Sequence, residues 1–385
     1  MRILIYNWRD LNHPNSGGAE VYTDRVAVEL VRKGHEVTLF CASVANKPDD
    51  EISEGGYRVI RRGGKHSVYG AAKQFWLKEG RGKFDVVIDE VNTRPFGAPR
   101  FVKGTPVVAL IHQVAREIWF YEYPWVVALF GRYVLEPIWL SWYRDVLVLT
   151  VSESSKESLI EYGLRNINVI PEGSDCHVAG RQLAEKENPP ALIFVGRLAR
   201  NKRPEHAIEA YRIVKRSFPE IKMWIVGSGP LIDELKAREC SDVHFFGRVS
   251  DEEKVDLIAK ASLLLVTSVR EGWGLVVSEA ASVGTMSIGY DVPGLRDSLT
   301  QSQGVIVSEG PEFMAQGICN ILRSDSAQKP RSTGGISSWK EVALAFERRI
   351  SDEVLGVGSP SRLSKSAFCE SLGQSTDGFI ENPIK

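Results

Sequence analysis

The chain has 385 residues, of which 43% are hydrophobic and 25% are charged, and its formal net charge at pH 7 is −1. This length exceeds what one hydrophobic core usually supports, so the sequence predicts a globular protein of two domains. The near-zero charge excludes a general attraction to nucleic acid, and no run approaches the roughly 18 apolar residues that a membrane-spanning helix needs.

The five cysteines are scattered and show no zinc-binding spacing. This pattern is typical of a reduced, cytoplasmic protein. The apolar residues near the amino end form only a short run (2–7), which predicts a strand and not a signal sequence.

In the first half of the chain, short apolar runs alternate with helical patterns, which predicts a parallel sheet covered by helices on both faces. The expected strands are 2–7, 36–41, 57–61, 84–89, 106–111 and 146–150. Between the first two strands, a helix with one apolar stripe follows Gly17-Gly18 and ends at Gly34. We therefore expect residues 1–170 to form a Rossmann-like, doubly wound lobe.

The second half repeats this architecture after a segment rich in proline, glycine and charge, residues 171–190, which we interpret as an interlobe linker. The expected strands lie near 191–196, 221–226, 243–246, 263–266, 285–289 and 304–307, and the helices near 204–217, 230–239, 251–260, 274–283 and 311–323. Residues 191–335 thus predict a second Rossmann-like lobe, facing the first across a cleft. An amphipathic helix within 336–351 is expected to cross back to the first lobe, and the serine-rich tail 356–385 is expected to be disordered.

Two strand-to-helix turns could bind phosphate. Gly17-Gly18 lets the backbone approach a ligand at a helix N-terminus, although a tight structural turn explains it equally well, because the full GxGxxG fingerprint is absent. After the first strand of the second lobe come Arg197 and Lys202, two cations suited to a diphosphate. The alternative for this pair is ordinary solvated loop charge.

The most informative stretch runs from Glu271 to Glu279. The helix that follows Trp273 is apolar nearly all round, so we expect it to be buried, and buried carboxylates need partners such as sugar or ribose hydroxyls. A glycosidase acid/base pair fits poorly, because eight helical residues span ~12 Å whereas such carboxyls lie about 5–9.5 Å apart.

With these residues, the chain from Met1 to about Ile350 resembles the retaining glycosyltransferases of group 1 (family 4), which have the two-lobed GT-B fold. The motif that carries the resemblance is the spacing of Glu271 and Glu279, followed by the turn from Tyr290 to Gly294. Trp273 stands where this family often has phenylalanine.

The resemblance implies a role for each candidate residue. Glu271 and His112 would contact the donor sugar, and Glu279 the nucleotide ribose. The donor diphosphate would be bound by Gly18, Arg197, Lys202, Gly272, Trp273, Gly274, Leu275 and Val276. No metal or other cofactor is expected; the co-substrate would be a UDP-, GDP- or ADP-sugar, transferred with retention to a glycan or lipid-linked acceptor.

Other functions stay open: a nucleotide-sugar 2-epimerase or a non-catalytic sugar-nucleotide-binding protein on the same fold. A nicotinamide oxidoreductase is disfavoured by the missing GxGxxG. Residues 58–83 are strongly basic and residues 118–143 are rich in tryptophan and tyrosine. These segments indicate either peripheral contact with an anionic membrane, or aromatic residues such as Trp76, Trp119 and Trp125 within a core beneath a solvated charged face.

Overall fold

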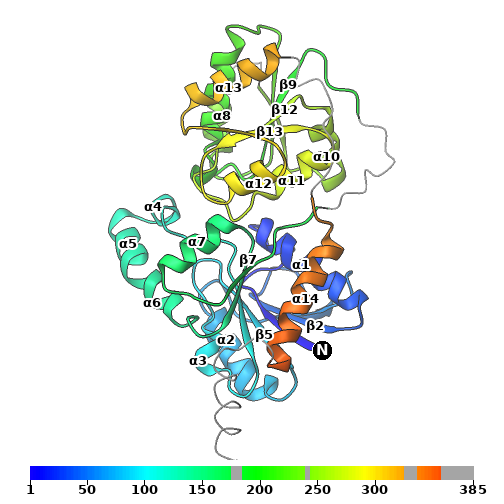
Figure 1. Cartoon of the computed structure of the whole chain (residues 1–385), viewed down its shortest axis with the longest axis vertical. Coiled ribbons are helices and arrows are strands. Elements are labelled where there is room, and N and C mark those ends of the chain that lie inside the picture. Colours follow the sequence, from blue (N-terminus) through cyan, green and yellow to red (C-terminus); the bar gives the residue numbers. More distant parts are fainter. Residues whose placement is uncertain (175–183, 239–242, 325–335, 357–385) are drawn as a thin grey trace, which may run out of the picture.

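The computed structural model describes residues 1–174, 184–238, 243–324 and 336–356. Two α/β lobes, each built on one sheet, lie one above the other (Figure 1). The prediction of two doubly wound, parallel-sheet lobes is confirmed. The predicted tail and part of the predicted linker, residues 357–385 and 175–183, lie outside the described residues.

The first lobe contains an eight-stranded sheet in the order β3-β4-β2-β1-β5-β6-β7-β8. Its strands are β1 (Arg2–Tyr6), β2 (Glu36–Cys41), β3 (Asp50–Ile52), β4 (Arg58–Arg61), β5 (Val86–Glu90), β6 (Val107–Leu110), β7 (Leu147–Thr150) and β8 (Ile167–Val169). Its helices are α1 (Gly18–Arg32), α2 (Val68–Phe75), η1 (Trp76–Gly80), α3 (Ala98–Phe101), α4 (Ile118–Glu122), α5 (Trp125–Phe130), η2 (Gly131–Leu135), α6 (Glu136–Ser141) and α7 (Glu153–Glu161). Among the described strands of this sheet, β3 alone pairs antiparallel, at the edge beside β4.

The second lobe contains a six-stranded parallel sheet in the order β11-β10-β9-β12-β13-β14. Its strands are β9 (Ala191–Val195), β10 (Lys222–Val226), β11 (Val243–Gly247), β12 (Leu263–Val266), β13 (Met286–Tyr290) and β14 (Val305–Val307). Its helices are η3 (Arg200–Lys202), α8 (Pro204–Lys215), α9 (Ile232–Arg238), α10 (Asp251–Lys260), α11 (Leu275–Ser282), α12 (Leu295–Gln301) and α13 (Pro311–Arg323).

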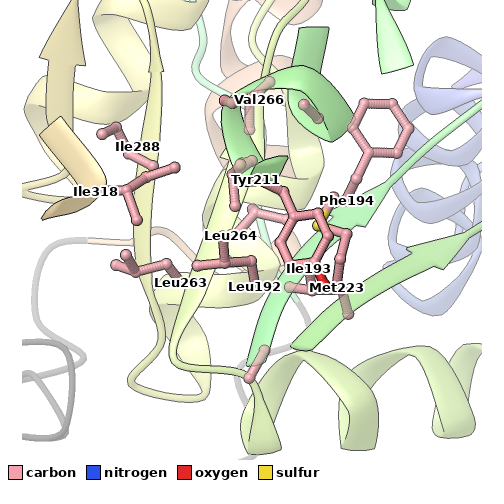
Figure 2. Packing of buried hydrophobic residues seen from close by; sticks show 14 of the residues in the cluster. Leu192, Ile193, Phe194, Tyr211, Met223, Leu263, Leu264, Val266, Ile288 and Ile318 are labelled. Atoms are coloured by element: carbon pink, nitrogen blue, oxygen red, sulfur yellow. The ribbon is translucent and has the colours of Figure 1, made fainter. Parts of the chain in front are cut away.

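The central strands are buried on both faces, which explains why they read as continuous apolar runs. In the second lobe, Ile193 of β9 and Leu264 of β12 are fully buried, and Figure 2 shows them among neighbours from both strands and from α8 and α13. The helices that cover the sheet supply the remaining core side chains, including Tyr211 and Ile318. Burial of these side chains stabilises the second lobe by the hydrophobic effect.

The last described helix, α14 (Trp339–Leu355), packs on the first lobe beside α1 (Figure 1). Ser338 and Glu341 form a capping box at its start, which satisfies backbone donors there. Phe346 and Ile350 are buried in the first-lobe core, and Glu347 lies 2.8 Å from His35 Nε2. The chain therefore returns to its first lobe after building the second.

The strand order of each sheet reverses beside its first strand, at β1 and at β9. At such switch points the loops after neighbouring strands diverge and leave a crevice outside the carboxyl ends. The loop from β1 to α1, the loop after β9 and the loop from β12 to α11 all line one cleft between the lobes. The two crevices are thus combined into a single site.

Candidate functional site

The interlobe cleft has a volume of about 740 Å³ and is lined by residues of both lobes. Every donor-site residue predicted from the sequence lines it: Gly18, His112, Arg197, Lys202, Glu271, Gly272, Trp273, Gly274, Leu275, Val276 and Glu279. A second cavity, of about 560 Å³, lies against α8 and α9 and is lined by none of these residues. The fold therefore brings together residues that are far apart in the sequence.

Two cations of the cleft, Arg197 and Lys202, come from the loop after β9. Arg197 is exposed there, and the Lys202 carbonyl accepts a hydrogen bond from Thr267 Oγ1 at 2.9 Å, which attaches this loop to the end of β12. The neighbouring turn after β10 needs glycine, because a Cβ on Gly227 would lie 2.0 Å from the Gly196 carbonyl oxygen. That turn has a structural role, since it supports the loop that carries Arg197.

Glu271 is mostly buried and has partners within the protein. Its Oε1 accepts hydrogen bonds from Ser268 Oγ at 2.6 Å and from Lys202 Nζ. The expectation that this carboxylate depends on a ligand for its partners is therefore wrong. Lys202, expected to face a diphosphate, contacts Glu271 in the cleft.

Glu279 is paired in the same way. Its Oε1 lies 2.9 Å from Lys254 Nζ of α10, which also lies 3.0 Å from Asp251 Oδ1. Burial lowers the pKa of Lys254, but the charge of Glu279 and the hydrogen bonds outweigh it, so the net pKa is raised. Lys254 was missed by sequence reasoning, because its 25-residue separation from Glu279 gives no local signal.

The helix α11 is only partly buried, which corrects the expectation of an all-round buried helix. Val277 and Ala280 are fully buried, whereas Leu275, Val276 and Glu279 are half-buried along the cleft. The helix begins after Gly274, whose φ of 92° is accessible mainly to glycine. Its first amide groups face the cleft with the positive end of the helix dipole.

Trp273 is buried, and its Nε1 donates to Ser278 Oγ at 2.9 Å. Its ring belongs to the apolar cluster that contains Tyr22 and Trp339 of the first lobe and α14. Only the backbone of Trp273 is therefore suited to a phosphate contact. From the other side, Gly18 approaches the start of α11 closely: a Cβ there would lie 3.4 Å from Leu275 Cδ1.

His112 follows β6 and is 7% exposed. Its Nδ1 lies 3.2 Å from Glu172 Oε1, and its Nε2 lies 3.6 Å from Glu90 Oε1. Burial alone would lower the pKa of His112, but the two carboxylates raise it to about 10. Glu172 and Glu90 were not identified as site residues from the sequence. The one available signal was the position of Glu90 at the end of an expected strand.

The basic segment 58–83 contains both buried and exposed residues, and its contact with a membrane stays a prediction. Trp76 is fully buried, and Arg61 is 1% exposed and paired with Asp10 and Glu51. Arg58 and Arg62 form surface ion pairs with Asp50 and Glu79. The remaining basic side chains of the segment are exposed.

The segment 118–143 has both buried and strongly exposed aromatic side chains. Trp119 is buried, and its Nε1 donates to Glu136 Oε2 at 3.3 Å, whereas Trp125 is 69% exposed. Most of the exposed large apolar side chains in the described part of the chain lie on α4, α5, η2 and α6, and we call this set the α4–α6 surface: Phe120, Tyr121, Tyr123, Trp125, Val126, Val127, Leu129, Phe130, Tyr133, Val134 and Ile138.

Within the described residues, no helix has the length and apolarity to span a bilayer. Nor do those residues contain a cluster of three or more His, Cys, Asp or Glu suited to a metal ion.

Comparisons with known proteins cover most of the chain. Residues 16–178 match the family model described as Glycosyltransferase Family 4, and residues 179–334 match Glycosyl transferases group 1. Glycogen synthase of Mycobacterium tuberculosis is 26% identical, with 90% of this chain and 93% of the relative covered. A GDP-mannose-dependent alpha-(1-6)-phosphatidylinositol dimannoside mannosyltransferase of that species is 23% identical, with 86% and 92% covered.

Among solved structures, the Anabaena protein HepE in complex with UDP-glucose has a TM-score of 0.69 at 17% identity, and covers 91% of this chain and 100% of its own. This likeness concerns the fold alone. Together with the two parallel sheets, it confirms the predicted GT-B architecture.

Proposed function

Since the chain is a glycosyltransferase of group 1, we propose that its interlobe cleft binds a nucleoside-diphosphate sugar and transfers the sugar to an acceptor hydroxyl with retention of configuration. The observation that carries this proposal is the convergence of Arg197, Lys202, the first turn of α11 and Glu279 on one cleft. A diphosphate needs the cations and amides, and a ribose needs an acceptor carboxylate. The relatives that use GDP-mannose or bind UDP-glucose make both nucleotides candidates for this chain.

In the proposed reaction, the bond between the anomeric carbon and the diphosphate breaks while the acceptor oxygen attacks from the same face. The acceptor proton passes to the departing phosphate oxygen. Arg197, Lys202 and the α11 amides stabilise the charge on the leaving group, a role that needs no metal ion. Glu271 then accepts hydrogen bonds from donor-sugar hydroxyls, and Lys202 is shared between Glu271 and the phosphates.

A panel of UDP-, GDP- and ADP-sugars tests this function in the full chain. We expect one nucleotide class to raise the unfolding temperature, because ligand binding to the folded state stabilises it. With that donor and an acceptor mixture, the free nucleoside diphosphate should accumulate and the new glycosidic bond should keep the donor's anomeric configuration by NMR. An isomerised free sugar would indicate an epimerase, binding without turnover would indicate a non-catalytic protein, and no stabilisation by any member would contradict donor binding.

We further propose that the acceptor is lipid-linked and that the α4–α6 surface contacts an anionic, cytoplasm-facing membrane. An apolar surface of this kind favours transfer into a bilayer interface, where tryptophan and tyrosine are typical. The Arg132 guanidinium lies 5.2 Å from the centroid of the Tyr133 ring and 3.5 Å from Glu117 Oε1, so a paired cation lies beside the apolar residues. Ile118 and Glu122 of α4 line the cleft, which supports delivery of a membrane-held acceptor to the site.

Co-sedimentation with vesicles of phosphatidylcholine and phosphatidylglycerol tests this contact. The wild-type chain should bind, and the double substitution Trp125→Ser with Phe130→Ser should reduce the bound fraction at least threefold, because each exposed aromatic contributes apolar area to the membrane contact. The matched control is Phe313→Ser, which changes an equally exposed aromatic on α13, in the other lobe. Equal binding by the double variant, or no binding by the wild type, would contradict the contact.

A further inference from the structure

The ring of His112 is enclosed by acidic groups from two separate parts of the first lobe. Glu90 lies at the end of β5, and Glu172 lies in the segment after β8. Glu172 Oε1 is 3.2 Å from Nδ1, and Glu90 Oε1 is 3.6 Å from Nε2. Tyr22 of α1 packs edge-to-face against the ring, with centroids 5.0 Å apart. Each ring nitrogen therefore faces its own carboxylate oxygen.

The Glu90 carboxylate is itself held in place. Thr23 Oγ1 donates to Glu90 Oε2 at 2.5 Å, so the other oxygen, Oε1, is directed at the imidazole. Neither Glu90 Oε1 nor His112 Nε2 has a hydrogen-bond partner among the described residues, and both atoms are buried. The polar contact that remains for these two atoms is the one between them, at 3.6 Å.

This geometry selects a protonation state. A neutral imidazole carries one N–H, so one of its nitrogens would direct a lone pair at a carboxylate in a buried site. An imidazolium has an N–H at both nitrogens, so it can donate to Glu172 and attract Glu90 without that repulsion. The direction of the His112 pKa, raised to about 10, agrees with this. Lys202 and Glu271 of the second lobe also act on this cluster; their charges affect Glu172 in opposite directions, and they are paired with each other. In the first lobe, Glu20 interacts with Glu90, and the buried Tyr22 hydroxyl interacts with both carboxylates.

We infer that Glu90 and Glu172 are positioning residues that hold His112 as an imidazolium, so that His112 can act in the cleft as a fixed cation but not as a proton-accepting base. This inference rests on the proposed function only for its catalytic consequence. The acceptor proton must then leave through the departing phosphate and not through His112. With both carboxylates ionised, as this assignment requires, the three groups carry one net negative charge, which suits a positively charged sugar carbon in the transition state.

The protonation state can be measured without any substrate, by NMR of the His112 ring in the full chain. We expect wild-type His112 to stay protonated from pH 5.5 to 9. In Glu172→Gln, one of the two anions is lost while burial remains, so the His112 pKa falls and the ring titrates within that range. The control is Glu161→Gln, which neutralises a largely exposed carboxylate paired with Arg116. A neutral His112 in the wild type near pH 7, or unchanged titration in Glu172→Gln, would overturn the inference.

The effect on catalysis is measured as the rate of nucleoside diphosphate release, with the donor that stabilises the chain. In Glu172→Gln, kcat should fall at high pH, with a midpoint equal to the one seen by NMR and a loss of about tenfold or more above it. The donor KM should change less, and Glu172→Asp should restore part of the high-pH activity. Thermal unfolding shows whether each variant is folded. If Glu172→Gln is unfolded, Glu90→Gln takes its place in the test. If the donor panel fails altogether, the NMR result still decides the inference.

Discussion

Replacing Glu271 by glutamine should lower kcat by about 10²–10³-fold, the usual cost of losing one electrostatic group from an enzyme's transition-state contacts. Glutamine has nearly the same size but no charge, so the pairing with Lys202 Nζ is weakened and the carboxylate near the reacting sugar is lost. Ser268 Oγ, now 2.6 Å from Oε1, can still donate to the amide oxygen. The loop should therefore keep its shape while the reaction slows.

The measurement is nucleoside diphosphate release at saturating donor, compared with Glu309→Gln. Glu309 also pairs with a cation of the second lobe, Arg203, but it lines the smaller cavity and not the cleft. That control should retain activity within about twofold, as surface ion pairs contribute little. A Glu271→Gln variant with unchanged kcat would remove Glu271 from the proposed mechanism.

Replacing Gly294 by alanine should displace the loop that carries Glu271. Gly294 precedes α12 with a φ of 78°, and a Cβ there would lie 2.0 Å from the Glu271 carbonyl oxygen and 2.6 Å from that of Gly272. Both contacts are to backbone atoms, which cannot rotate away. We expect a cost of about 2–5 kcal/mol from the left-handed conformation and the clash together, and loss of most turnover.

The control substitution Gly104→Ala separates the backbone strain from the steric clash. Gly104 has the same φ of 78°, but no atom lies within 4 Å of the position that a Cβ would take. This control should cost about 1–2 kcal/mol, from backbone strain alone, and leave turnover unchanged. Thermal unfolding and the release assay on both variants check this. Equal stability and equal turnover of the two variants would show that the contact between Gly294 and the Glu271 loop is unimportant.

The main elements of the fold could be predicted because each sheet is buried on both faces. Ile193 and Leu264 lie in runs that are apolar at every position, and the helices between them carry clear stripes. The edge strand β3 could not be predicted, since Asp50–Ile52 is short and mostly acidic, and it pairs with β4 through backbone hydrogen bonds and through ion pairs with Arg58 and Arg61. The position of Glu271 and Glu279 at the cleft followed from one local motif and needed no tertiary information.

The partners of these residues depend on tertiary contacts that the sequence does not encode locally. Lys254 meets Glu279 only because α10 packs against α11, and Glu172 meets His112 only because β7 brings the ends of β6 and β8 to the same edge of the sheet. The burial of aromatic side chains could not be predicted from the local sequence either. Trp76 and Trp125 both occur in segments that suit a membrane interface, yet one is fully buried and the other is 69% exposed.

The central claim, that one cleft binds a sugar nucleotide through groups of both lobes, is tested most directly by calorimetric titration of the stabilising donor into the wild type, Glu279→Ala and Asp251→Ala. Each substitution removes one carboxylate partner of Lys254, but only Glu279 lines the cleft. The wild type and Asp251→Ala should bind one donor per chain with similar affinity. Glu279→Ala should bind at least about tenfold more weakly, because a hydrogen bond to a charged group contributes ~1.5–3 kcal/mol. Equal affinity of all three proteins would contradict the claim.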